Sequence, residues 1–251
     1  MKKLTAFLFM GLLALPVFAQ QPQKEETPSP ILRSNVFTAQ DGLFSINLMD
    51  HVFFGYNIVD SDAFTPNGGG ELSLNALALN VSPAPSFGFQ VGMDCKWQFF
   101  STHDSRFYLD KNKIPQVIAY PIPTPGNQAQ ATNALPEESM TSKFRGSLHT
   151  FSLAIPVLAT LHVNDNFWFS AGAEANLNMT SWTNFHAESG DVTETTSVAD
   201  GQVRPFTFNF MVMIGFRDAA LFFKYYPKTS RIVPDGGVEF DYCAAGVTLF
   251  L

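Results

Sequence analysis

Large apolar residues occupy every second position in the stretch from Phe206 to Phe216. The residues between them, from Thr207 to Gly215, carry no charge. A period of two along the chain is typical of a β-strand whose two faces meet different surroundings. This stretch is therefore predicted to form a strand with one strongly apolar face and one mild face.

The same alternation recurs along the chain and predicts antiparallel strands over residues 44–58, 70–82, 87–99, 147–163, 167–185, 206–216, 221–226 and 238–250. Asp50 interrupts the first segment, which predicts a bulge or a buried partner at that position. In the second segment the apolar parity changes after Ala76, which predicts another bulge. Pro156 lies inside the fourth segment, where a proline requires an edge or a bulge.

The predicted connections are sorted by length. Longer loops follow the first, third, fifth and seventh strands, and short turns follow the second, fourth and sixth. Outer-membrane β-barrels have short periplasmic turns and longer external loops on an even number of strands. A soluble sandwich gives no physical reason for this sorting. The loop of residues 103–145 is the longest, and it is the expected contact site for an unknown extracellular ligand or protein.

The two strand faces indicate which side of the barrel is apolar. Only 15% of the residues are charged, against about 25% in typical soluble domains. One face of nearly every strand carries Phe, Trp, Tyr, Leu, Ile or Val, and the other carries small and polar residues. The interior of an eight-stranded barrel is just wide enough for its own side chains. We therefore expect an all-β, eight-stranded, antiparallel up-and-down transmembrane barrel with lipid outside and a filled, non-porin interior.

The few charges on the milder face nearly balance in sign. Because a buried charge is costly unless it is paired, we expect pairing across the lumen among Asp94, Lys96, Glu174, Lys224, Glu239 and Asp241. Two alternatives stay open. Some of these side chains could lie in wet rims, and the chain could be a soluble secreted ligand carrier with its apolar face inward.

The N-terminus has the pattern of a secretory signal peptide. A basic start precedes an apolar run that ends in small residues, so cleavage is expected between Ala19 and Gln20. Residues 20–42 are polar and proline-rich and are expected to form a flexible periplasmic arm, followed by the barrel over residues 43–251. After the signal peptide no stretch is long and apolar enough for a transmembrane helix. Membrane crossing would then require a closed barrel, and we expect the cell outer membrane as the location.

Two short segments resemble a known family. Residues 152–158, SLAIPVL, resemble the L-E-I-P-L-L strand of the PorT-like outer-membrane β-barrel family, with Ala154 at the position of the family's acidic residue. The chain end GVTLFL resembles the C-terminal signal read by barrel-assembly machinery, here Gly246, Leu249, Phe250 and Leu251. The resemblance covers about residues 43–251 and implies an outer-membrane barrel. The family's namesake is tied to protein secretion, so a secretion-accessory role is one implied function, although fold does not transfer function.

Known catalytic and metal-binding motifs are not recognisable. The sequence contains no G-x-S-x-G, P-loop, H-E-x-x-H or C-x-x-C, so no enzyme activity, cofactor or metal is expected. The net charge of −7 gives no indication of nucleic-acid binding. Cys95 and Cys243 lie on non-neighbouring predicted strands and are expected to be free.

A lipid-modifying enzyme remains an alternative. Lipid A-modifying barrels use a His and a Ser near the external rim, and His149 beside Ser147, or His186 beside Ser189, imitates that arrangement. No orienting acid is placed at a known spacing, so these residues are better explained as polar residues of the rim. The favoured interpretation is a monomeric structural or binding barrel that contacts outer-membrane lipid and acts through its extracellular loops.

Overall fold

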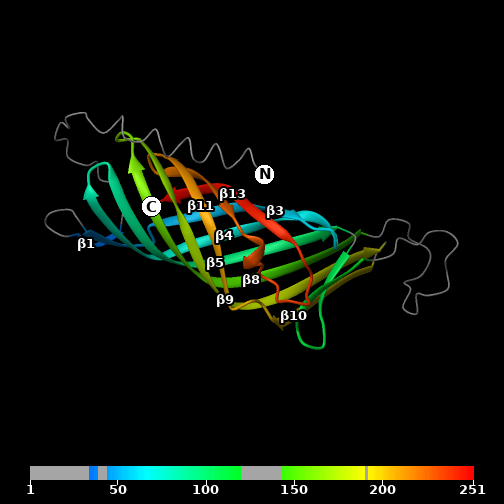
Figure 1. Cartoon of the computed structure of the whole chain (residues 1–251). Helices are drawn as coiled ribbons and strands as arrows, with labels where there is room; N and C mark the ends of the chain where they lie inside the picture. Colours follow the sequence, from blue (N-terminus) through cyan, green and yellow to red (C-terminus); the bar gives the residue numbers. More distant parts are fainter. Residues whose placement is uncertain (1–33, 39–43, 104, 120–142, 190–191) are drawn as a thin grey trace, which may run out of the picture.

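Eight strands pair side by side into a closed ring. The computed structural model describes residues 34–38, 44–103, 105–119, 143–189 and 192–251. The ring consists of β3 (His51–Asp60), β4 (Thr65–Ala84), β5 (Phe87–His103), β8 (Lys143–His162), β9 (Phe167–Ser189), β11 (Phe206–Phe216), β12 (Ala219–Tyr225) and β13 (Asp241–Phe250). Each pairs antiparallel with the next ring strand along the chain, and β13 pairs with β3 (Figure 1). The predicted eight-stranded antiparallel barrel is confirmed.

The two ends of the barrel differ. One end, which we call the turn end, holds the connections 85–86, 163–166 and 217–218 and the end of β13. The other end, the loop end, holds the β6–β7 hairpin (Ser105–Leu109 and Pro115–Ala119), β10 (Val192–Gly201) and the short 3-10 helix η2 (Lys228–Ser230) (Figure 1). The prediction of a long loop after the first strand is wrong, because β4 already begins at Thr65. The connection after the fifth predicted strand, expected as a loop, is partly strand: β9 continues to Ser189, and β10 pairs with it.

The start of the barrel wall is a strand with a break, as predicted at Asp50. β2 (Phe44–Leu48) and β3 both pair antiparallel with β4, and their registers differ by one residue. The break lies at Met49, whose φ of 51° is in the left-handed region. β1 (Ser34–Thr38) pairs with β2 and belongs to the segment expected as a flexible arm. The expected signal peptide, with its cleavage between Ala19 and Gln20, lies outside the described residues, as does the rest of the arm.

The predicted bulge after Ala76 is confirmed, because the β4–β5 register shifts between Asn75 and Leu77. Pro156 interrupts the β5–β8 ladder without changing its register: the flanking pairs Val91–Val157 and Asp94–Ala154 keep one alignment. A proline cannot donate a ladder hydrogen bond, and the ring of Pro156 lies against Gly92, where a Cβ would come within 2.9 Å of it. Gly92 therefore makes room for a proline in the middle of the wall.

Every ring strand turns large apolar side chains outward. Phe206, Phe216 and Leu221 are 58% to 65% exposed, and all eight ring strands contribute to this outer apolar belt. Its exposed members on the ring strands include Phe54, Tyr56, Leu74, Phe89, Val91, Ile155, Val157, Phe169, Leu177, Phe210, Val212, Ile214, Phe223, Tyr225, Val247 and Leu249. The outward positions of β11 and β12 carry no charged residue. Among the described residues, no helix is long and apolar enough to cross a membrane.

Small residues inside the barrel leave room for a few bulky ones. Trp168 lies at the turn end and packs against Phe250, with ring centroids 5.3 Å apart. Its indole lies where a side chain of Gly215 would otherwise be, because a Cβ on Gly215 would come within 1.9 Å of the Trp168 ring. The glycine in this mild face of β11 is therefore a packing requirement.

We predict that Gly215→Ala destabilises the barrel by about 1–3 kcal/mol, because Trp168 must move to admit the methyl group. The free energy of unfolding in urea, measured in detergent micelles, tests this. Gly88→Ala is the matched control, since its Cβ would have no neighbour nearer than 3.5 Å. In a Trp168→Ala background the Gly215→Ala cost is expected to shrink. An equal cost in both backgrounds would contradict the packing account.

Candidate functional site

Two lysines and two glutamates meet in the middle of the lumen. Lys224 forms ion pairs with Glu71 and, at 2.9 Å, with Glu174. Lys96 forms an ion pair with Glu174 at 2.5 Å. Tyr226 donates its hydroxyl to Glu71 at 2.7 Å. We call these five residues the ion network; all four charged side chains are fully buried.

The charges of the ion network sum to zero, and most of its oxygens have donors. Gln98 donates to Glu71 at 2.9 Å, and Asn209 donates to Glu174 at 2.7 Å. Taking a charge out of water costs several kcal/mol unless pairing and hydrogen bonds offset it. The network satisfies both conditions, so it can exist in a lumen sealed from water. Its pairs join β4, β5, β9 and β12 across the interior.

A second polar group, which we call the acidic cluster, lies nearer the turn end. His51 lies between two buried carboxylates, with Nδ1 3.3 Å from Asp50 and Nε2 3.5 Å from Asp94. Asn75 donates to Asp94 at 2.7 Å, and Gln90 donates to Asp50 at 2.9 Å. Asp50, which interrupts the apolar pattern of its strand, thus has the buried partners that the sequence predicted it would need.

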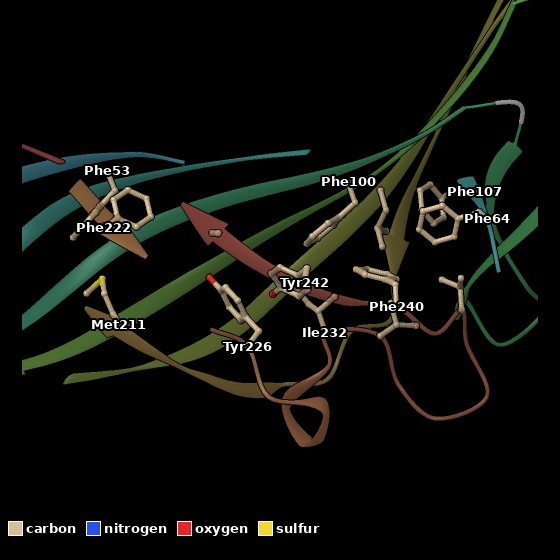
Figure 2. Close-up of a cluster of buried hydrophobic side chains, with 14 of the residues drawn as sticks. Phe53, Phe64, Phe100, Phe107, Met211, Phe222, Tyr226, Ile232, Phe240 and Tyr242 are labelled. Carbon is tan, nitrogen blue, oxygen red and sulfur yellow. The ribbon is translucent and has the colours of Figure 1, made fainter. Parts of the chain in front are cut away.

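Buried apolar and aromatic side chains share the lumen with these polar groups. Figure 2 shows Phe53 beside Phe222, and Tyr226, Tyr242 and Phe240 further along the lumen. Phe53 and Phe222 pack edge to face at 5.2 Å, and the Phe53 ring lies 4.7 Å from the ammonium of Lys224. Towards the loop end, Tyr226 stacks on Tyr242 at 4.1 Å. Beyond it a group of buried rings, the aromatic plug, fills the lumen with Phe64, Phe100, Phe107, Phe240 and Tyr242.

The structure separates the six residues expected to pair inside the barrel. Lys96, Glu174 and Lys224 share the ion network, whereas Asp94 belongs to the acidic cluster. The interior position expected for Glu239 and Asp241 is wrong. Their side chains are 75% and 28% exposed at the loop end, where both pair with Arg231, at 2.5 and 3.1 Å.

The error has a physical cause at the start of β13 and in the residues just before it. An interior position for Glu239 and Asp241 requires their neighbours Phe240 and Tyr242 to face outward, but both are buried and belong to the aromatic plug. Their neighbours Glu239 and Asp241 are therefore turned out to the rim. There the pKa of Lys228 is raised by its hydrogen bond to Asp241, and the pKa of Arg231 is raised chiefly by its hydrogen bond to Glu239.

Sequence reasoning also missed Glu71, His51 and Tyr226. Glu71 alternates with Leu72 and Leu74 in the first half of β4, which was a usable signal for an inward carboxylate. His51 follows directly on Asp50, but its inward position depends on the break at Met49. Tyr226 lies just past the end of β12 and reaches Glu71 only through the fold.

The outer wall carries an aromatic row near the loop end. The ring of His149 stacks between Trp97 and Trp182, with centroids 5.6 and 5.2 Å away. Ser147 Oγ lies 2.9 Å from His149 Nε2, and the amide of Asn184 approaches the same nitrogen at 3.2 Å. His149 Nδ1 is buried and has no hydrogen-bond partner in the described part of the chain. The structure thus brings Ser147 and His149 together, without a carboxylate on the imidazole.

The remaining predicted positions are placed as follows. His186 is exposed and its Nδ1 lies 3.2 Å from Thr195 on β10. Cys95 and Cys243 are free. Gly246, Leu249 and Phe250 lie in the second half of strand β13. The amide of Leu251 donates to the Asp50 carbonyl at 2.9 Å. Within the described ranges, no group of three or more His, Cys, Asp or Glu residues is arranged to hold a metal ion.

Comparisons with known proteins assign this chain to no family. No protein-family model matches the chain, and no curated protein matches it. The crystal structure of Ail, the attachment invasion locus protein of Yersinia pestis, matches at 10% identity and a TM-score of 0.30, over 83% of this chain and 97% of that chain. At that score the likeness carries no argument, and the barrel rests on the pairing of this chain's own strands. The PorT-like resemblance stays a prediction.

We predict that Glu174→Gln destabilises the barrel by about 3–5 kcal/mol, because it leaves two buried lysines with one carboxylate. The double variant Lys96→Met with Glu174→Gln restores neutrality and is expected to recover a large part of that loss. Urea unfolding in micelles gives both values. Lys113→Met is the control, since its pair with Asp200 is exposed and 3.9 Å long and should contribute less than about 1 kcal/mol. A double variant no more stable than the single one would refute charge balance as the cause.

Proposed function

We propose that this chain is an integral outer-membrane β-barrel whose filled barrel anchors it in lipid and whose loop end binds a partner or ligand. The single observation that carries this proposal is the outer apolar belt, to which all eight ring strands contribute. A monomeric soluble protein rarely exposes a contiguous apolar patch larger than a few hundred Å². An apolar belt around the whole wall, with charged side chains paired in the lumen, fits a barrel that is surrounded by lipid.

Two further features support lipid outside. In a closed ring every strand pairs with a neighbour on both sides, so its backbone N–H and C=O groups are hydrogen-bonded within the protein. A β-structure must meet this condition to cross a bilayer. β3, β11 and β13 contain 10, 11 and 10 residues, close to the roughly 9–11 residues with which a tilted strand crosses the hydrocarbon core. The ends of β8 and β9, at 20 and 23 residues, then project beyond the membrane at the loop end.

The filled interior favours an anchor over a pore. The acidic cluster, the Phe53–Phe222 pair, the ion network and the aromatic plug occupy successive levels of the lumen. A ligand carrier with an apolar cavity needs the opposite arrangement. The expected signal peptide and the C-terminal pattern of Gly246, Leu249, Phe250 and Leu251 suit export and delivery to the barrel-assembly machinery. A secretion-accessory role, as the PorT-like resemblance implies, is a finer form of the same proposal.

The binding role is assigned to the loop end because most of the structure beyond the ring lies there, although β1 and β2 lie by the turn end. The β6–β7 hairpin, β10 and the long ends of β8 and β9 lie at that end. At the turn end, by contrast, the three connections are two to four residues long. The segment expected to bind, residues 103–145, begins and ends on this projecting wall, although its residues 120–142 lie outside the described part of the chain.

A lipid-modifying enzyme is the second candidate, and the 2.9 Å contact between Ser147 and His149 favours it. Two features weigh against it. Two donors, Ser147 and Asn184, converge on Nε2 of His149, which leaves its proton on Nδ1. An activated serine requires that Nδ1 proton to be held by an orienting group, and Nδ1 has no such partner among the described residues. The tryptophans on both faces also hold the ring as a packed aromatic element.

We predict that Val212→Arg, in the middle of β11, destabilises the folded barrel in lipid by about 2–4 kcal/mol, because it places a charge against hydrocarbon. Ser197→Arg on β10 is the matched control at the loop end and should be nearly neutral. The assay is urea unfolding in vesicles, followed by the mobility shift between boiled and unboiled samples. A soluble barrel would tolerate Val212→Arg as well as Ser197→Arg and would show no such shift.

His149→Ala is expected to leave the mass spectrum of the outer-membrane lipids unchanged in cells that produce the protein. The comparison is with cells that produce the unaltered chain, at matched protein level. A lipid species that appears only with the unaltered chain would favour the enzyme. Ser147→Ala should then abolish the same species.

A further inference from the structure

We propose that the outer wall of β5, β8 and β9 near the loop end is a binding site for the phosphate-bearing headgroup of an anionic membrane lipid. The proposal rests on the proposed function, because it needs the outer apolar belt to lie in lipid. It adds a ligand class and a place on the barrel wall. It is carried by the order of side chains along the three strands and by a hollow at its polar end.

Strand pairing aligns outward side chains of β5, β8 and β9 in rows. Nearest the barrel middle the row is apolar: Cys95, Leu153 and Leu177. Four residues further along β8 comes the row Phe99, His149 and Trp182. The next row carries hydroxyl and amide groups: Ser101, Ser147 and Asn184. The last row is basic: His103, Arg145 and His186. The wall therefore passes from apolar through aromatic and neutral polar to basic.

This order matches an amphiphile at a bilayer surface. Aromatic residues prefer the boundary between acyl chains and headgroups, and basic groups attract anionic headgroups. From His149 to Arg145 is four residues, or about 14 Å along a strand and about 10 Å in height at a tilt of roughly 45°. The headgroup zone of one leaflet is about 5–8 Å deep, and an arginine side chain can reach back over the difference.

A hollow of about 380 Å³ lies at the polar end of these rows. The polar residues that line it include Asn67, Ser101, Arg145, Ser147, His186 and Thr195, together with Asn184. No residue that lines it carries a carboxylate, although the whole chain has a net charge of −7. The volume is in the range of small-molecule sites, and the lining is a set of donors around one permanent cation.

The donors suit phosphate. The guanidinium of Arg145 is exposed and forms no ion pair with a described residue, and arginine binds phosphate oxygens through two parallel N–H groups. His186 Nδ1 lies by Thr195 Oγ1 at 3.2 Å, which leaves its Nε2 for a ligand. Asn67 and Ser101 offer an amide and a hydroxyl on the β4–β5 side of the hollow. A lipid phosphate seated here would extend its acyl chains along the aromatic and apolar rows.

The test uses the full chain in detergent micelles and short-chain phosphatidylglycerol as the probe. Arg145→Gln is expected to weaken binding by about tenfold, the loss of one charge-assisted contact, and His186→Gln to weaken it less. Arg217→Gln is the matched control, because Arg217 is an exposed arginine at the turn end. Unchanged mobility of the unboiled variants on gels shows that each barrel is folded.

The outcomes distinguish a lipid phosphate from free phosphate. They also distinguish failure of the lipid site from failure of the proposed function. Binding that Arg145→Gln weakens, that Arg217→Gln leaves alone and that inorganic phosphate does not displace supports the lipid site. If inorganic phosphate displaces phosphatidylglycerol at equal concentration, the site binds a free anion, and the lipid-site proposal is overturned. Equal effects of the two arginine variants, or none, would also overturn it. Failure of the proposed function appears separately, because the unaltered chain would then fail to float with phosphatidylcholine vesicles.

Discussion

The closure of eight strands around a narrow lumen is the constraint on which the rest of the structure depends. Side chains alone fill such an interior, so every inward charge must find a partner within it. Glu71, Lys96, Glu174 and Lys224 do this on strands that mostly are not neighbours in the ring. Their pairs tie non-adjacent strands together across the lumen, while the ladders tie adjacent strands. A change that unbalances them would weaken the ring as a whole, and not one contact alone.

Closure also decides what the two surfaces can do. With polar groups paired inside, the apolar residues of each strand have only the outside to face, and the belt is the result. The lumen is then a filled support, and chemistry and recognition are left to the ends and the outer wall. The projecting parts of β5, β8 and β9 belong both to the outer wall and to the loop end. They extend beyond the outer apolar belt and carry basic and hydroxyl groups in aligned rows.

The alternation of residues made much of the fold predictable. The strands, their outward faces, the break at Asp50 and the bulge after Ala76 all follow from a period of two and its interruptions. It failed at β13, where bulk was taken as a sign of the lipid side. Phe240 and Tyr242 are bulky because they seal the loop end from within. Local alternation cannot distinguish an aromatic residue that faces lipid from one that fills a lumen.

The sequence by itself determined the eight ring strands and, for most of them, which side is apolar, because these depend on neighbours one or two positions apart. It also indicated that buried charges need partners. Only the tertiary structure decided which partners they have: Lys224 reaches Glu71 across 153 positions of sequence, and Asp94 pairs with a histidine and not with a lysine. Those choices depend on the register with which eight strands close, which is a property of the ring and of no single segment.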